Sequence, residues 1–84
     1  MLALSPTDTL TEVVRESFRQ EQDGYFYPVE PGTPLVRVYI ARDSYTIERR
    51  RNAQSPWMAL VVAAVEEFDP TAFRTWRAHW GVVA

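Results

Sequence analysis

The sequence contains no cysteine and no lysine, and it has a single histidine. Without cysteine the chain cannot form a disulfide, a thiolate nucleophile or a cysteine-ligated zinc or iron–sulfur site. His79 alone cannot make a multi-histidine metal site, so we expect no metal and no cofactor. All nine basic residues are arginine. Because arginine codons are richer in G and C than lysine codons, this favours a GC-rich bacterial or phage genome.

The sequence also lacks long apolar runs and catalytic motifs. No apolar run approaches the roughly 18 to 20 residues that cross a bilayer, and the opening MLALSPTD does not have the pattern of a signal peptide. A glycine-rich phosphate loop, a nucleophile elbow and metal-ligand spacing are missing as well. Glu66 and Glu67 would diverge on a helix and do not form an acid–base pair. We therefore predict a cytoplasmic protein that is not an enzyme, has no catalytic residues and does not bind membranes.

The sequence does contain enough apolar surface for one small core. Of its 84 residues, 46% are hydrophobic and 24% are charged, a composition that excludes intrinsic disorder and predicts a soluble fold. The length suits one domain, residues 1–84. The net charge of −2 is unevenly distributed, with a balance of −4 in residues 1–30 and +3 in residues 35–51. We expect an acidic part and a basic part of the surface.

Three pairs of a capping residue and proline predict helix starts, because proline is favoured at the first helical position. Ser5-Pro6 begins an expected helix from Pro6 to Gln22, which Gly24 would end. Ser55-Pro56 begins a long helix whose apolar residues recur at helical spacing. These residues are Trp57, Leu60, Val61, Ala64, Val65 and Phe68.

The third pair, Asp69-Pro70, begins a short final helix that ends at Gly81. One face of this helix would carry Phe73, Trp76, Arg77 and Trp80. An aromatic stripe at this spacing is more often part of a core than a binding surface, although tryptophan and arginine also dominate interfaces. Both interpretations are open for FRTWRAHW.

The middle of the chain predicts strands. YFYPVEPGTP suits a short edge strand that ends in a turn at Pro31-Gly32. LVRVYIAR alternates, with Val36, Val38 and Ile40 on one face and Arg37 and Tyr39 on the other. A hairpin turn at Asp43-Ser44 would lead into YTIERR.

The expected fold is α+β, in the order α-β-β-β-α-α, with a small three-stranded antiparallel sheet packed by helices on one face. In its core the long helix would pack on the alternating strand, so that Leu60→Ala costs on the order of 2 to 5 kcal/mol. The side chains expected to meet there are Trp57, Leu60, Val61, Val65, Phe68, Val36, Val38 and Ile40. On the back of the long helix, Ala59, Val62 and Ala63 form an apolar strip. Either the final helix or a second copy of the chain would cover this strip.

The order of a helix, three strands and a helix is similar to that of the double-stranded RNA-binding domain. In this comparison ERRRNAQSPWMALVVAAVEEF occupies the place of that family's third strand, basic loop and second helix. The likeness is topological and does not extend to the residues that carry that family's function. That family places lysines in the first turn of its last helix to hold phosphates. Here the corresponding turn is Pro56, Trp57, Met58 and Ala59, with no basic residue.

The arginines of the hairpin form the strongest candidate site. We expect a compact basic surface because three consecutive arginines end one hairpin strand and two more lie on the other arm. The candidate partner-binding residues are Arg37, Tyr39, Arg42, Arg49, Arg50 and Arg51. Three interpretations are open: an acidic protein partner, a nucleic acid, or solvated charges that prevent edge-to-edge strand pairing. Nucleic-acid domains are usually net basic and this chain is net acidic, which favours the protein partner over the nucleic acid.

A ridge of acids on the first helix, Asp8, Glu12 and Glu16, is a weaker candidate. It could imitate a phosphate backbone, or it could stabilise the helix start through the helix dipole.

These observations predict a non-catalytic protein-binding module. We expect a small bacterial or phage accessory or inhibitor protein that docks, as a monomer or homodimer, on a protein partner with an acidic surface. The alternative is an RNA- or DNA-binding domain that uses the hairpin arginines. Salt distinguishes the two, because phosphate binding weakens steeply as the salt concentration rises.

Overall fold

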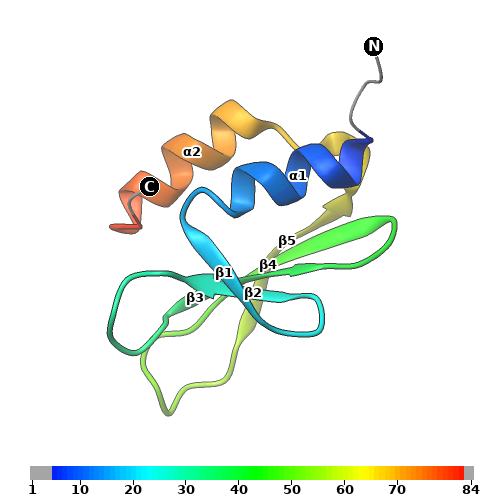
Figure 1. Ribbon diagram of the computed structural model, residues 1–84. Helices are drawn as coiled ribbons and strands as arrows, with labels where there is room; N and C mark the ends of the chain where they lie inside the picture. Colours follow the sequence, from blue (N-terminus) through cyan, green and yellow to red (C-terminus); the bar gives the residue numbers. More distant parts are fainter. Residues whose placement is uncertain (1–4, 83–84) are drawn as a thin grey trace.

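The computed structural model describes residues 5–82, which form a five-stranded antiparallel sheet with two helices. Strands adjacent in sequence are neighbours in the sheet, in the order β1-β2-β3-β4-β5. The elements are α1 (Pro6–Val14), β1 (Phe18–Gln22), β2 (Tyr25–Pro28), β3 (Val36–Ile40), β4 (Ser44–Arg49), β5 (Met58–Ala64), the 3-10 helix η1 (Val65–Glu67) and α2 (Pro70–His79). Both helices lie on the same side of the sheet (Figure 1). The fold is α+β as expected, but the predicted three-stranded sheet is wrong.

The first additional strand, β1, occupies the last five residues of the predicted first helix. Ser5 caps α1 as expected, since its Oγ accepts a hydrogen bond from the Asp8 N–H at 3.1 Å. The helix nevertheless ends at Val14 and not at Gln22. The chain then forms β1, which pairs with β2 across a turn that contains Gly24. Pairing with β2 overrides the helix propensity of this segment, as tertiary context often does.

The second additional strand replaces the predicted long helix. Ser55 does not cap a helix, because its Oγ donates to Asn52 Oδ1 at 3.0 Å. Met58–Ala64 instead pairs along β4. An uninterrupted apolar run fits the period of a strand as well as that of a helix, so spacing alone could not separate them. Because this segment is β5, the topological likeness to the double-stranded RNA-binding domain is lost.

Two further expectations concern β3 and α2, and both are confirmed. In β3, Val36 and Val38 are buried while Arg37 lies on the other face. The Asp69 side chain caps α2 by accepting hydrogen bonds from the N–H groups of Thr71 and Ala72. By contrast, the prediction of β2 as an edge strand is wrong, because β1 covers its other side.

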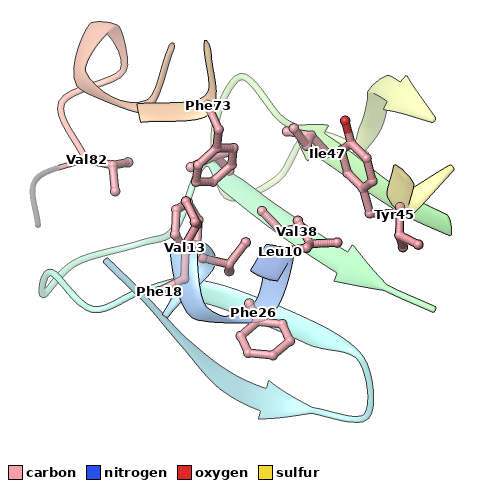
Figure 2. Close-up of a cluster of buried hydrophobic side chains, with 12 residues drawn as sticks. Leu10, Val13, Phe18, Phe26, Val38, Tyr45, Ile47, Phe73 and Val82 are labelled. Atoms are coloured by element: carbon pink, nitrogen blue, oxygen red, sulfur yellow. The ribbon is translucent and has the colours of Figure 1, made fainter. Parts of the chain in front are cut away.

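The core lies between the helices and the inner face of the sheet (Figure 2). Its buried side chains are Leu10, Val13, Val14, Phe18, Phe26, Val36, Val38, Tyr45, Ile47, Val65, Phe73 and Val82. The aromatic stripe of α2 belongs to this core, with Phe73 buried and both Trp76 and Trp80 packed against it. Phe18 and Phe73 meet with ring centroids 5.9 Å apart, which joins β1 to α2.

The predicted packing of residues 57–68 is only partly correct. Val65 is buried, and Val61 and Phe68 pack against the core. Leu60, however, is 50% exposed, and Trp57 lies on the outer face of the sheet, where its ring is 4.4 Å from the Arg37 guanidinium. The loss of stability predicted for Leu60→Ala assumed a buried leucine, so this prediction is wrong.

The strand period also divides the predicted apolar strip. Ala63 faces the core and is partly buried, whereas Val62 is 70% exposed and Ala59 is also exposed. The final helix therefore covers only one side of this segment.

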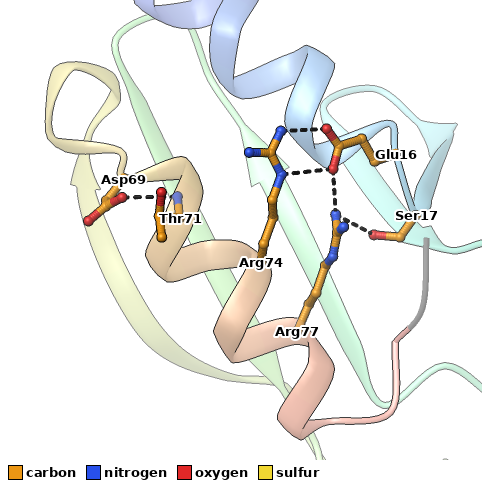
Figure 3. Close-up of polar contacts among 6 residues, drawn as sticks. All are labelled: Glu16, Ser17, Asp69, Thr71, Arg74 and Arg77. Atoms are coloured by element: carbon orange, nitrogen blue, oxygen red, sulfur yellow. Dashed lines mark hydrogen bonds and ion pairs between the residues drawn. The ribbon is translucent and has the colours of Figure 1, made fainter.

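Glu16 connects the turn after α1 to α2 (Figure 3). Its carboxylate accepts hydrogen bonds from Arg74 Nη2 at 2.6 Å and from Arg77 Nη1 at 3.0 Å. Arg77 is buried and also donates to Ser17 Oγ at 3.3 Å. The hydrogen bond from Arg74, with a further contribution from Arg77, lowers the pKa of Glu16 to about 2. Glu16 is therefore a structural residue beyond the end of α1, and it does not complete the predicted acidic ridge.

Candidate functional site

The outermost strand β5 leaves several large apolar side chains exposed. Met58, Leu60 and Val62 are 67%, 50% and 70% exposed. In the described part of the chain, no strand pairs with the second edge of β5. This strand has neither a charged residue nor a proline, whereas the opposite edge strand β1 carries exposed Arg19 and Glu21. Since charges and prolines protect sheet edges from pairing, β5 is an unprotected edge.

The free edge of β5 also presents backbone groups. The Val65 N–H donates to the Asp43 carbonyl at 3.0 Å, so the neighbouring pair Ser44–Ala64 is of the non-hydrogen-bonded kind. Hydrogen-bonded and non-hydrogen-bonded pairs alternate along an antiparallel ladder. The pair Thr46–Val62, two positions from Ser44–Ala64, is therefore also non-hydrogen-bonded. The N–H and C=O groups of Val62 and Ala64 therefore point away from β4.

The start of β5 meets the arginines that the sequence singled out. A shallow hollow of about 380 Å³ is lined by Arg49, Arg50, Arg51, Met58 and Leu60. Methionine and arginine are both enriched at protein interfaces, where apolar contact area is combined with directional hydrogen bonding.

The two ends of β5 are flanked by opposite charges. Arg49 lies opposite Met58 in the ladder, and Arg51 follows two residues later. At the other end, exposed Glu66 and Glu67 follow directly in η1. The β5 edge thus runs from a basic end to an acidic end.

Arg37, one of the arginines of the predicted basic surface, is engaged within the protein. Its guanidinium lies 4.4 Å from the ring centroids of both Tyr25 and Trp57. Arg37 Nε donates to Glu48 Oε1 at 2.7 Å, and Nη1 donates to the Tyr27 hydroxyl at 3.2 Å. Burial disfavours the charged form, but the hydrogen bonds outweigh it and raise the pKa of Arg37. The ion pair with Glu48 compensates the charge of Arg37.

Arg50 and Arg49 are held by aromatic rings. The Arg50 guanidinium lies 4.3 Å from the Trp57 ring centroid, and its Nε donates to the Pro34 carbonyl at 2.9 Å. Arg49 lies 4.4 Å from the Trp80 ring centroid. Neither contact neutralises the charge, so both arginines contribute to the positive potential at this end of the sheet.

The remaining predicted residues differ in their surroundings. Arg51 is exposed and makes no ion pair within the described residues. Arg42 lies in the turn between β3 and β4, at the other end of the hairpin. Tyr39 packs on Tyr25, with ring centroids 4.7 Å apart. The structure therefore brings Arg49, Arg50 and Arg51 together and places Arg42 away from them.

A second hollow of about 200 Å³ opens between α2 and the inner face of β4 and β5. Its apolar lining includes Val61, Phe68 and Trp76, and Glu67 and Asp69 also border it. This hollow and the exposed side chains of β5 could not be predicted from a helical assignment. The signal that could have indicated them is the run MALVVAA, which has β-branched residues and no charge.

Within residues 5–82, no group of three or more histidine, aspartate or glutamate side chains could hold a metal ion. The helices in that part of the chain are too short and too polar to cross a membrane.

Comparisons with protein-family models, with curated proteins and with solved structures gave no significant match.

Proposed function

We propose that the chain is a non-catalytic protein-binding module that docks on a protein partner through β5. The β5 surface consists of Met58, Leu60 and Val62 with the flanking Arg49 and Arg51. Because the register with β4 shifts between Ile47 and Glu48, Met58 (opposite Arg49) and Val62 (opposite Thr46) lie on different faces, and this surface extends around the free edge. The proposal is supported by the exposure of apolar side chains on an unprotected sheet edge beside arginines. Contiguous exposed apolar side chains rimmed by polar groups are typical of protein-contact surfaces. An acidic surface on the partner would complement the arginines.

In this role the chain acts by occupying a surface of its partner, as accessory and inhibitor proteins do. The apolar side chains would supply affinity through burial, and the arginines would supply orientation and a faster association rate.

Capture of partners from the native host, identified by mass spectrometry, tests this proposal. Val62→Asp places a charge on the β5 surface, and Val29→Asp makes the same change at a valine that is 54% exposed outside it. We expect Val62→Asp to lose the captured protein and Val29→Asp to retain it. Equal recovery with the two variants would contradict the assignment of β5.

The alternative, contact with RNA or DNA, is tested in the same experiment. Capture through phosphates would be abolished by nuclease and would fall steeply between about 50 and 200 mM salt. Because the ion pair with Glu48 compensates the charge of Arg37, fewer of the hairpin arginines are available for phosphate contact. We expect recovery to survive nuclease treatment.

A further inference from the structure

The β5 edge is built to accept another strand. Val62 and Ala64 direct their backbone N–H and C=O groups away from β4. A strand added there would pair with these groups and cover part of the exposed Leu60 and Val62 side chains. An added strand would therefore both bond the free backbone groups of this edge and bury part of its apolar surface.

The charges at the ends of β5 restrict which strand can be added. An antiparallel strand begins at the acidic end of β5, near Glu66, and finishes at the basic end, near Arg51. Its own flanks should therefore be basic at the start and acidic at the finish. β5 itself has this order, with Arg49 and Arg51 before it and Glu66 and Glu67 after it.

We propose that the strand that pairs with the β5 edge belongs to a second copy of this chain. Two copies related by a two-fold axis would join their sheets through antiparallel β5 strands, because such an interface presents the same surface twice. With the axis at Val62, Leu60 of one copy lies opposite Ala64 of the other and Met58 lies opposite Glu66, so the hollow that Arg51 lines beside Met58 comes close to Glu66 at both ends. This inference rests on the proposed protein-binding role of β5 and names its partner.

Sedimentation or light scattering at micromolar concentration tests the inference directly. We expect the wild type to have twice the chain mass of 9.7 kDa. Val62→Lys should shift the protein to the monomer, because a lysine on an edge strand opposes pairing. Gln20→Lys places the same charge on the β1 edge and should leave the dimer intact. A monomeric wild type at about 100 µM, or a Val62→Lys protein as dimeric as the wild type, would overturn the inference.

A charge exchange tests the antiparallel arrangement. Arg51→Glu and Glu66→Arg each create like-charge contacts at both ends of the homodimer. We expect each variant alone to dimerise about threefold to tenfold more weakly than the wild type. Mixing the two variants restores opposite charges at both ends, so the mixture should recover association. A mixture that associates no better than either variant alone would contradict the two-fold antiparallel pairing.

The absence of cysteine allows a test that can capture a weak dimer. Val62→Cys introduces the chain's single thiol, and in two copies paired at Val62 a short bifunctional thiol reagent should join the two thiols. Gln20→Cys on β1 is the matched control and should remain largely uncross-linked. Equal cross-linking of the two variants would count against pairing at β5.

The inference and the proposed function fail in different ways. A monomeric wild type whose Val62→Asp variant nevertheless loses a captured foreign protein would overturn the second-copy inference and leave the proposed function standing. A wild type that dimerises through Val62, while capture is unchanged in Val62→Asp, would support the inference and contradict docking of a foreign protein on β5.

Discussion

At the scale of single residues, Gly24 sets the connection between β1 and β2. Its φ is +75°, and an added Cβ would lie 2.7 Å from Tyr39 Cε1 and 3.1 Å from the Ile40 carbonyl oxygen. We expect Gly24→Ala to lower the free energy of unfolding by about 1 to 3 kcal/mol, measured by urea denaturation. Gly81 has a φ of +74° with open space around its Cβ position. A loss in Gly81→Ala as large as that in Gly24→Ala would show that the Tyr39 contact contributes nothing.

A matched pair of leucines tests the assignment of the core. Leu10 is fully buried and Leu60 is 50% exposed. Leu10→Ala is therefore expected to cost about 2 to 5 kcal/mol of unfolding free energy, through lost burial and a cavity. Leu60→Ala should cost less than about 1 kcal/mol, because its side chain is already half in water. Comparable shifts of the two denaturation midpoints would contradict the strand assignment of β5.

At the scale of elements, two adjacent valines of β5 differ in the direction of their backbone N–H. Val61 lies opposite Ile47 in a hydrogen-bonded pair, whereas Val62 directs its N–H to the free edge. Val61→Pro should therefore destabilise the protein by about 3 kcal/mol or more, and Val62→Pro should cost much less. Thermal denaturation at nanomolar concentration, below the range in which the dimer is expected, measures both. If Val62→Pro lost more stability than Val61→Pro, the Val62 N–H, and not the Val61 N–H, would be the group that bonds to β4.

At the same scale, only part of the candidate site could be predicted from the sequence. The cluster Arg49 to Arg51 is evident in the sequence, and the structure places it beside a hollow on the surface. Its apolar neighbours Met58 and Leu60 were not predicted, because a helical assignment turned Leu60 toward the core. The engagement of Arg37 could not be predicted either, since it depends on Glu48 and Trp57 lying beside it on the outer face.

At the scale of the whole molecule, Glu16 joins the turn after α1 to α2 through Arg74 and Arg77. Its pKa is lowered from an ordinary 4.5 to about 2, first by the hydrogen bond from Arg74. A lowered pKa contributes stability that is present above pH 4.5 and is lost as the pH falls through about 2. We expect the difference in unfolding free energy between the wild type and Glu16→Gln to shrink over this range. Denaturation at several pH values measures it.

The control for this pH dependence is Glu12→Gln, which removes an exposed carboxylate that forms no ion pair in the described part of the chain. This variant should not reproduce the narrowing seen for Glu16→Gln. If it does, the pH dependence comes from the general charge of the protein and not from the contact between Glu16 and α2.

Local signals were sufficient for three parts of the fold. The caps at Ser5 and Asp69 depend on hydrogen bonds to residues no more than three positions away, so the helix starts are encoded locally. The alternation in β3 identifies its buried face, because every second side chain points the same way.

The tertiary structure determines that β1 and β5 are strands and not helices. The segment FRQEQ has helix-forming residues, and MALVVAA is apolar at every position, so neither has a local pattern that excludes the helix. Each becomes a strand through a ladder with a neighbouring strand, β1 with β2 and β5 with β4. The same pairing leaves Val62 exposed on a free edge. The candidate interface therefore exists only once the sheet has formed, because a helix satisfies its backbone internally and has no such edge.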